Sequence, residues 1–135
     1  MIRVKRISSG EEDFIIELER KLDLEVPQFK TSELWIIEEG NEPVGLARIT
    51  DLGPAYFLSS VGLLPQKRGR GLATQLLQAI LAERKKDVYL YTIIPEFFFR
   101  FGFEITKVPS FLPPRDIFSC HLCEPKKCFC LVKRC

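Results

Sequence analysis

The chain has 135 residues, of which 46% are hydrophobic and 28% are charged, a balance typical of one globular domain and too apolar for a disordered chain. Its 20 basic and 18 acidic residues leave a net charge of +2, which argues against nucleic-acid binding driven by phosphate neutralisation. No stretch has the length and apolarity of a membrane span, and residues 1–13 lack the apolar core of a signal peptide. We therefore expect a cytoplasmic protein that binds neither nucleic acid nor membranes.

The first half of the chain predicts one helix and four strands. Residues 2–7 alternate apolar and basic side chains, as a half-buried strand does. Residues 8–24 predict a helix that begins with the capping-box spacing of Ser9 and Glu12, and residues 23–32 predict a loop. Residues 33–39 and 44–50 predict an antiparallel hairpin, and the longer apolar run at residues 55–64 predicts a central strand.

The second half predicts two more helices and two more strands. Apolar residues recur on one helical face from residue 72 to residue 86. Residues 87–92 and 103–108 predict strands, and between them Pro95 begins a short aromatic helix that Gly102 ends. This order predicts an α/β fold with a mixed sheet. We expect one domain over residues 1–119, with a Cys-rich tail at residues 120–135 that packs on it or extends it.

A basic, glycine-containing loop separates the central strand from the following helix (Lys67, Arg68, Gly69, Arg70 and Gly71). Free N–H groups in the first turn of a helix bind anions, and glycine lets the backbone approach a phosphate. The loop therefore predicts an anion site, and the alternative is a solvated basic turn. The phosphate-loop motif G-x-x-x-x-G-K-[ST] is absent, and the dinucleotide motif G-x-G-x-x-G fails at Thr74.

The motif Gln66-x-x-Gly69-x-Gly71, after a strand that ends in "VGLLP", closely resembles the Q/R-x-x-G-x-G/A signature of the GNAT N-acetyltransferase superfamily. The element order over residues 1–105 and the block "FFFRFGFE" at residues 97–104 are also similar to that family. The resemblance implies a single-domain fold whose mixed sheet is flanked by helices, and acetyl-CoA as co-substrate. It implies contacts to this co-substrate from the end of the central strand, the loop, the helix start and the aromatic block: Val61, Gly62, Leu63, Gln66, Lys67, Arg68, Gly69, Arg70, Gly71, Leu72, Ala73, Thr74 and Phe98.

The implied reaction is direct attack of a primary amine on the acetyl thioester, for which a base must take a proton from the amine. In much of the family a tyrosine protonates the leaving thiolate, but the matching residue here is Phe98. The weak candidates for proton transfer are Ser60, Glu96 and Tyr91. Each also fits a purely structural role, namely a backbone hydrogen bond, stabilisation of a helix N-terminus and strand packing, respectively.

The sequence does not identify the acceptor of the acetyl group. The second half resembles short N-acetylglutamate-synthase-like acetyltransferases, which often carry a Glu and an Arg on the central strand where this chain has Phe57 and Ser59. The acceptor is therefore glutamate, another amino acid, a small amine or a peptide N-terminus, and we expect residues 23–32 and 109–114 to form its side of the site. A catalytically weak acetyl-CoA-binding regulatory domain and a zinc-tailed interaction module are the alternatives, and a homodimer is left open.

All five cysteines and the single histidine lie in the tail. Cys120, Cys123, Cys128 and Cys130 offer four thiolates for a structural zinc ion, although their spacing departs from that of zinc ribbons. Disulfides and unmodified core thiols are the two alternative interpretations.

Overall fold

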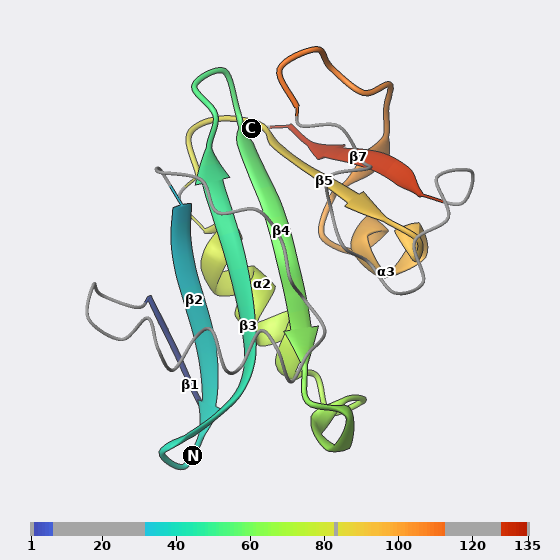
Figure 1. The fold of residues 1–135 in the computed structure, drawn as a ribbon. Helices are drawn as coiled ribbons and strands as arrows, with labels where there is room; N and C mark the ends of the chain where they lie inside the picture. Colours follow the sequence, from blue (N-terminus) through green and yellow to red (C-terminus); the bar gives the residue numbers. More distant parts are fainter. Residues whose placement is uncertain (1, 7–31, 83, 113–127, 135) are drawn as a thin grey trace.

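The computed structural model describes residues 2–6, 32–82, 84–112 and 128–134, and within them seven strands form one sheet in the order β1-β2-β3-β4-β5-β7-β6 (Figure 1). All neighbouring strands are antiparallel except β4 and β5, which are parallel. The sheet is therefore mixed, as the sequence predicts. The strands are β1 (Ile2–Arg6), β2 (Ser32–Glu39), β3 (Glu42–Asp51), β4 (Tyr56–Leu63), β5 (Val88–Thr92), β6 (Glu104–Ile105) and β7 (Phe129–Lys133).

The predicted hairpin and central strand are both confirmed. β2 and β3 pair antiparallel around a turn in which Gly40 takes a left-handed conformation with φ of 67°. β4 is the fourth strand of the seven and is bordered by β3 and β5. The unalternating apolar run predicted this position because a central strand is covered on both faces.

The helix α2 (Leu72–Leu81) packs on one face of the sheet, behind β2, β3 and β4 in Figure 1. Its apolar stripe is fully buried against alternate residues of these strands, because successive strand side chains point to opposite faces. The other residues of these strands therefore point to the face of the sheet opposite α2. The α2 side of the core includes Ile37, Ala47, Ile49, Leu58, Leu76, Leu77, Ile80, Leu90 and Leu131.

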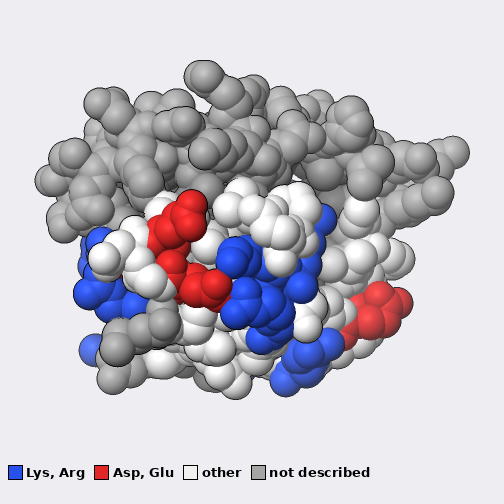
Figure 2. Space-filling model, turned by 90° about the horizontal axis from the view of Figure 1, so that it is seen from below, with Lys and Arg blue, Asp and Glu red and all other residues white. Residues whose placement is uncertain are grey.

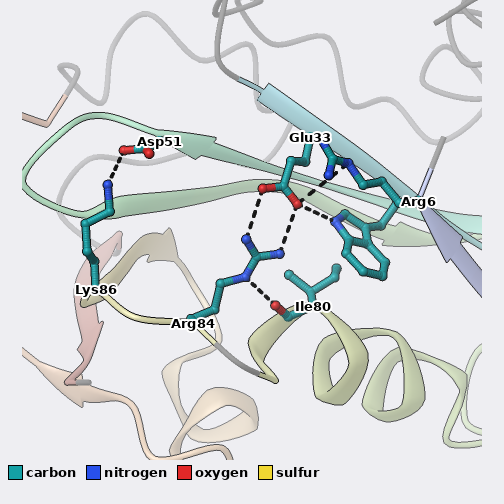
Figure 3. Close-up of polar contacts among 7 residues, drawn as sticks. Arg6, Glu33, Asp51, Ile80, Arg84 and Lys86 are labelled. Carbon is teal, nitrogen blue, oxygen red and sulfur yellow. Dashed lines mark hydrogen bonds and ion pairs between the residues drawn. The ribbon is translucent and has the colours of Figure 1, made fainter. Parts of the chain in front are cut away.

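The helix α2 ends at Leu81, so the prediction that it extends to residue 86 is wrong. Ala82 already has an extended backbone with ψ of 138°. The Arg84 side chain folds back and donates to the carbonyl of Ile80 in the last turn (Figure 3). A basic side chain on a terminal carbonyl is a common way to end a helix, because it satisfies an acceptor that has no intrahelical partner.

The strand after the aromatic helix α3 (Pro95–Phe99) is shorter than predicted, and a further strand follows that the sequence did not predict. β6 covers only residues 104 and 105 of the predicted 103–108, since only these two residues pair with β7. β7 comes from the Cys-rich tail and lies between β5 and β6. At least this part of the tail therefore belongs to the same sheet as the rest of the chain.

Several predicted segments lie outside the described residues. These are the helix within residues 8–24, the loop at residues 23–31, residues 113 and 114, and the domain boundary at residue 119. Within the described part of the chain, no helix is long and apolar enough to cross a membrane.

Candidate active site

The two parallel strands β4 and β5 pair along only part of their length. Their register ends at Leu58 opposite Leu90, and β5 continues beyond this point paired with β7 alone. Figure 1 shows β4 and β5 diverging from there to form a V. Within the described residues, the β5-facing edge of residues 59–63 therefore has no neighbouring strand, so its backbone groups, apart from the Leu63 carbonyl that accepts from Arg68, are available to an extended ligand.

The loop at the open end of the V has the backbone geometry expected of an anion site. Gly69 and Gly71 have φ of 78° and 76°, and no atom lies within 4 Å of where a Cβ would project from either residue. Gly71 is also the N-cap of α2, which has no side-chain capping bond and no acidic residue in its first turn. The N–H groups at the helix start are thus aimed at the loop without a side-chain partner, as at many phosphate sites.

Two of the three loop cations already contact a carboxylate of the protein. Glu39, the last residue of β2, accepts a hydrogen bond from Lys67 at 2.8 Å and pairs with Arg70 at 2.6 Å. The bond from Lys67, followed by that from Arg70, lowers the pKa of Glu39 to about 2. Arg68 instead donates to the carbonyl of Leu63 at 3.2 Å. Figure 2, which views this end of the sheet, shows acidic side chains directly beside the group of basic ones.

The predicted contact residues divide by exposure into three groups. Gln66, Arg68, Arg70 and the two loop glycines are exposed, whereas Leu63 and Leu72 are buried in the core. The two leucines therefore have only backbone groups to offer a ligand. Phe98 is buried as well, and the remaining predicted contacts are half-buried, namely Val61, Gly62, Lys67, Ala73 and Thr74.

The comparisons with known proteins identify the family. Residues 30–105, more than half of the chain, match the model of the acetyltransferase (GNAT) domain. The chain belongs to the GNAT acetyltransferase family. A search of curated proteins finds no match. The resemblance inferred from the loop motif and the element order is therefore confirmed, and with it the expectation of an N-acetyltransferase.

Solved structures share the fold at low sequence identity. Escherichia coli ElaA is 17% identical with a TM-score of 0.71, and the match covers 99% of this chain and 100% of that one. A GNAT family acetyltransferase from Elizabethkingia anophelis, solved with acetyl-CoA bound, is 14% identical with a TM-score of 0.66 over 99% and 98% of the two chains. N-acetylglutamate synthase from Neisseria gonorrhoeae, solved with coenzyme A and N-acetyl-glutamate, is 15% identical with a TM-score of 0.65, and the match covers 99% of this chain and 35% of the synthase. The predicted GNAT fold is thus confirmed.

The candidates for proton transfer lie at different places in this GNAT domain. Ser60 belongs to β4, two residues past the last pair with β5. Tyr91 belongs to β5, one residue past that pair, and its ring meets Phe57 edge to face at 5.3 Å. Glu96 is an exposed residue in the first turn of α3. Ser60 and Tyr91 are thus beside the point where the V opens, and their roles stay predictions.

The other tyrosines and Phe98 have clear packing roles. Tyr56, at the far end of β4, lies under the cationic groups of Arg84 and Lys86 at 5.0 and 4.9 Å from its ring centre. Tyr89 packs edge to face on Phe111 at 5.4 Å. Phe98 is buried in the α2 side of the core. Its contact with the co-substrate therefore stays a prediction, and it offers no proton.

The tail cysteines are only partly described. Cys120 and Cys123 lie outside the described residues, and within the described ones no group of three or more His, Cys, Asp or Glu residues has the arrangement of a metal site. Cys128 and Cys130 are buried. Cys130 packs with Phe57 and Leu112 on the face of the sheet opposite α2, which agrees with a core thiol. The zinc prediction stays untested.

Sequence reasoning missed two residues that shape this site, Glu39 and Gly45. Glu39 looks like an ordinary surface residue, because its partners Lys67 and Arg70 are distant in sequence. Gly45 could have been identified from the sequence, since a glycine within a strand often marks a place where another backbone or a ligand approaches closely. A Cβ there would lie 2.3 Å from Leu63 Cδ2 and 2.9 Å from the carbonyl oxygen of Gly62.

Proposed function

We propose that this chain transfers the acetyl group of acetyl-CoA to the primary amine of a small acceptor, for which an amino acid such as glutamate is the leading candidate. The observation that carries the proposal is the V between β4 and β5, which leads from the end of the paired register at Leu58 to the start of α2. A long, narrow thioester with a diphosphate at one end matches these two features. Binding of acetyl-CoA by the Elizabethkingia protein of the same fold supports this choice.

Each part of the ligand has a matching group in the chain. The free N–H groups at the start of α2, together with the left-handed glycines, suit the diphosphate. Arg68 adds a cationic group that is exposed at the loop. The unpaired edge of residues 59–63 suits the amides of the pantetheine arm, which would bond to it as a neighbouring strand does.

The chemistry needs few protein groups. The amine nitrogen attacks the thioester carbonyl carbon, a C–N bond forms, the C–S bond breaks, and the sulfur leaves with its electron pair. One proton must leave the amine, and one can add to the thiolate. Because a thiolate is a good leaving group, positioning of the two reactants supplies much of the rate increase, and Ser60 and Tyr91 are the nearest candidates for moving protons.

The proposal is tested by binding and turnover together. We expect calorimetry to show one acetyl-CoA site per chain, and thiol release to continue steadily with at least one member of a panel of amines and amino acids. Mass analysis of the product should show the added acetyl group. Binding without steady turnover on any acceptor would instead support a regulatory acetyl-CoA-binding domain, and no binding would overturn the proposal.

A further inference from the structure

Buried polar side chains gather on the face of the sheet opposite α2. Among the described residues, the buried polar or charged ones are Glu38, Arg48, Thr50 and Ser59. Arg48 is only 2% exposed and Ser59 only 8%. Within the described part of the chain, the buried Ser59 Oγ has no hydrogen-bond partner. Such a hydroxyl is rare in a native protein and calls for an explanation, such as a functional role or a bound water or ion.

Arg48 and Ser59 lie side by side on this face. Ala47 and Ile49 pack with α2, so Arg48 between them points to the opposite face. Leu58 also packs with α2, which places Ser59 opposite it in the same way. Arg48 in β3 and Ser59 in β4 are direct partners in the antiparallel register. Side chains of such partners are neighbours on one face of a sheet.

This pair borders the opening of the V. Ser59 is the first residue of β4 after the last pair with β5. Phe57, two residues before it, packs against Tyr91 of β5 with 5.3 Å between the ring centres. Under the proposed function, the thioester end of acetyl-CoA reaches the narrow end of the V. The guanidinium and the hydroxyl are therefore beside the place where the acceptor must lie.

We infer that Arg48 and Ser59 bind the carboxylate of the acceptor, and that the acceptor is a free amino acid. This inference rests on the proposed function. A guanidinium presents planar, parallel donors that match the two oxygens of a carboxylate, and a serine hydroxyl adds one more donor. The Arg48 guanidinium has five N–H donors, so it can keep a hydrogen bond within the protein while it binds the acceptor. The aromatic surface of Phe57 and Tyr91 beside the pair excludes water, which strengthens such bonds.

The wild-type chain provides the first test. Thiol release from acetyl-CoA is measured with amino acids and with their α-carboxamides, which keep the amine but lack the charge. We expect kcat/KM to be about 10- to 100-fold higher for the acids. The α-amine of an amino-acid amide is a weaker base than the α-amine of the free acid, so more of it is unprotonated and reactive at neutral pH. This difference alone favours the amides, which is the opposite of the expected preference. Equal or better use of the amides would overturn the inference while leaving the proposed acetyl transfer intact.

Variants provide the second test. Arg48→Met should remove the preference for acids by raising KM for them about 10- to 100-fold, with little change for amides and unchanged acetyl-CoA affinity by calorimetry. Arg48→Lys should restore part of the preference. The control is Arg3→Met. Arg3 lies on the edge strand β1, pairs with Glu38 of β2, and has a side chain that is 60% exposed. We expect this control to behave as the wild type.

A third variant covers the case in which Arg48→Met fails to fold. Ser59→Ala removes a hydroxyl that has no partner among the described residues, so we expect it to fold. It should raise KM for the acids about 3- to 10-fold and leave the amides unchanged. A folded Arg48→Met or Ser59→Ala variant that keeps the full preference for acids would show that the pair is only structural. Failure of every acceptor despite bound acetyl-CoA would overturn the proposed function as well.

Discussion

The guanidinium of Arg84 and the carboxylate of Glu33 form a two-point ion pair, with N–O distances of 3.0 and 3.1 Å, that joins the end of α2 to β2 (Figure 3). Trp35 Nε1 also donates to Glu33. Both charged side chains are largely buried, at 12% and 21% exposure. The pair therefore fixes the helix whose other end adjoins the predicted anion-binding loop.

We expect Glu33→Gln to lower the free energy of unfolding by about 1–3 kcal/mol, because it leaves a buried guanidinium with weaker acceptors. Urea unfolding measures this. Glu104→Gln is the matched control, since the pair that Glu104 forms with Arg134 is about 60% exposed on both sides and should contribute less than about 1 kcal/mol. Equal effects of the two variants would contradict a special role of the Arg84 pair.

The same pair predicts a pH dependence. Burial raises the pKa of Glu33, but the hydrogen bonds from Arg84 and Trp35 outweigh it and hold the pKa below its ordinary value of 4.5. A carboxyl with a lowered pKa in the folded chain contributes stability above its ordinary pKa and loses it as the pH falls. The difference in unfolding free energy between wild type and Glu33→Gln should thus be constant above about pH 6 and shrink below about pH 4.5. A difference that grows on acidification would contradict this assignment.

The glycines of the loop allow a matched pair of variants. Gly71→Val and Gly53→Val both place a branched residue at positive φ, 76° and 98°, in otherwise open space. Both should lose about 1–3 kcal/mol of stability from backbone strain. Only Gly71→Val should abolish acetyl-CoA binding in calorimetry, because its side chain would fill the approach to the start of α2. Equal affinity of the two variants would remove the loop from the proposed site.

The carboxylate of Glu39 pairs with Lys67 and Arg70, so we expect it to compete with acetyl-CoA for these cations. A diphosphate that takes these cations must displace it, and its negative charge lies next to that of the phosphates. We expect Glu39→Gln to raise the affinity for acetyl-CoA by about 3- to 10-fold at low salt, and less at high salt. Glu42→Gln, an exposed change in the same hairpin, is the control. A weaker affinity in Glu39→Gln would mean that the carboxylate holds the cations in place for the ligand.

The tyrosines can be tested one at a time. A thiolate leaves readily without a proton, so Tyr91→Phe, Tyr89→Phe and Tyr56→Phe should each keep kcat within about tenfold of the wild type. Tyr56 serves as the distant control, since it lies at the far end of β4 beside Lys86. A loss of about 100-fold or more in Tyr91→Phe alone, with acetyl-CoA affinity intact, would show that Tyr91 is the general acid.

Periodic patterns predicted most of the described fold. The hairpin, the central strand, α2 and the loop at its start all follow from local apolar spacing and glycine placement. The end of α2 did not, because Arg84 and its partner Glu33 are 51 residues apart. The strand β7 did not either, because its residues, Phe129–Lys133, lack the apolar–polar alternation that indicates a strand. In the structure, Cys130 and Val132 alternate with Phe129 and Leu131 as ordinary strand residues do.

The site was predictable only where a motif is local. Gln66, Gly69 and Gly71 indicated the loop, but Glu39 lies 28 residues before Lys67 and reaches it only through the fold of the hairpin. Arg48 is likewise placed beside Ser59 by the register of β3 and β4, which includes an irregularity between Leu46 and Arg48. Such an irregularity leaves no clear signal in a single sequence.

The close approach of β3 and β4 at Gly45 gives the last prediction. A Cβ at this position would lie 2.3 Å from Leu63 Cδ2 and 2.9 Å from the carbonyl oxygen of Gly62, so Gly45→Ala requires the Leu63 side chain to move and the backbone at the end of β4 to shift. Because residues 61–63 form the proposed edge for the pantetheine arm, we expect both lower stability, by about 1–3 kcal/mol, and weaker acetyl-CoA binding. The double variant Gly45→Ala/Leu63→Ala removes the clashing methyl group and should recover part of the affinity. Strictly additive losses in this double-mutant cycle would show that Gly45 and Leu63 do not act on the site through their contact.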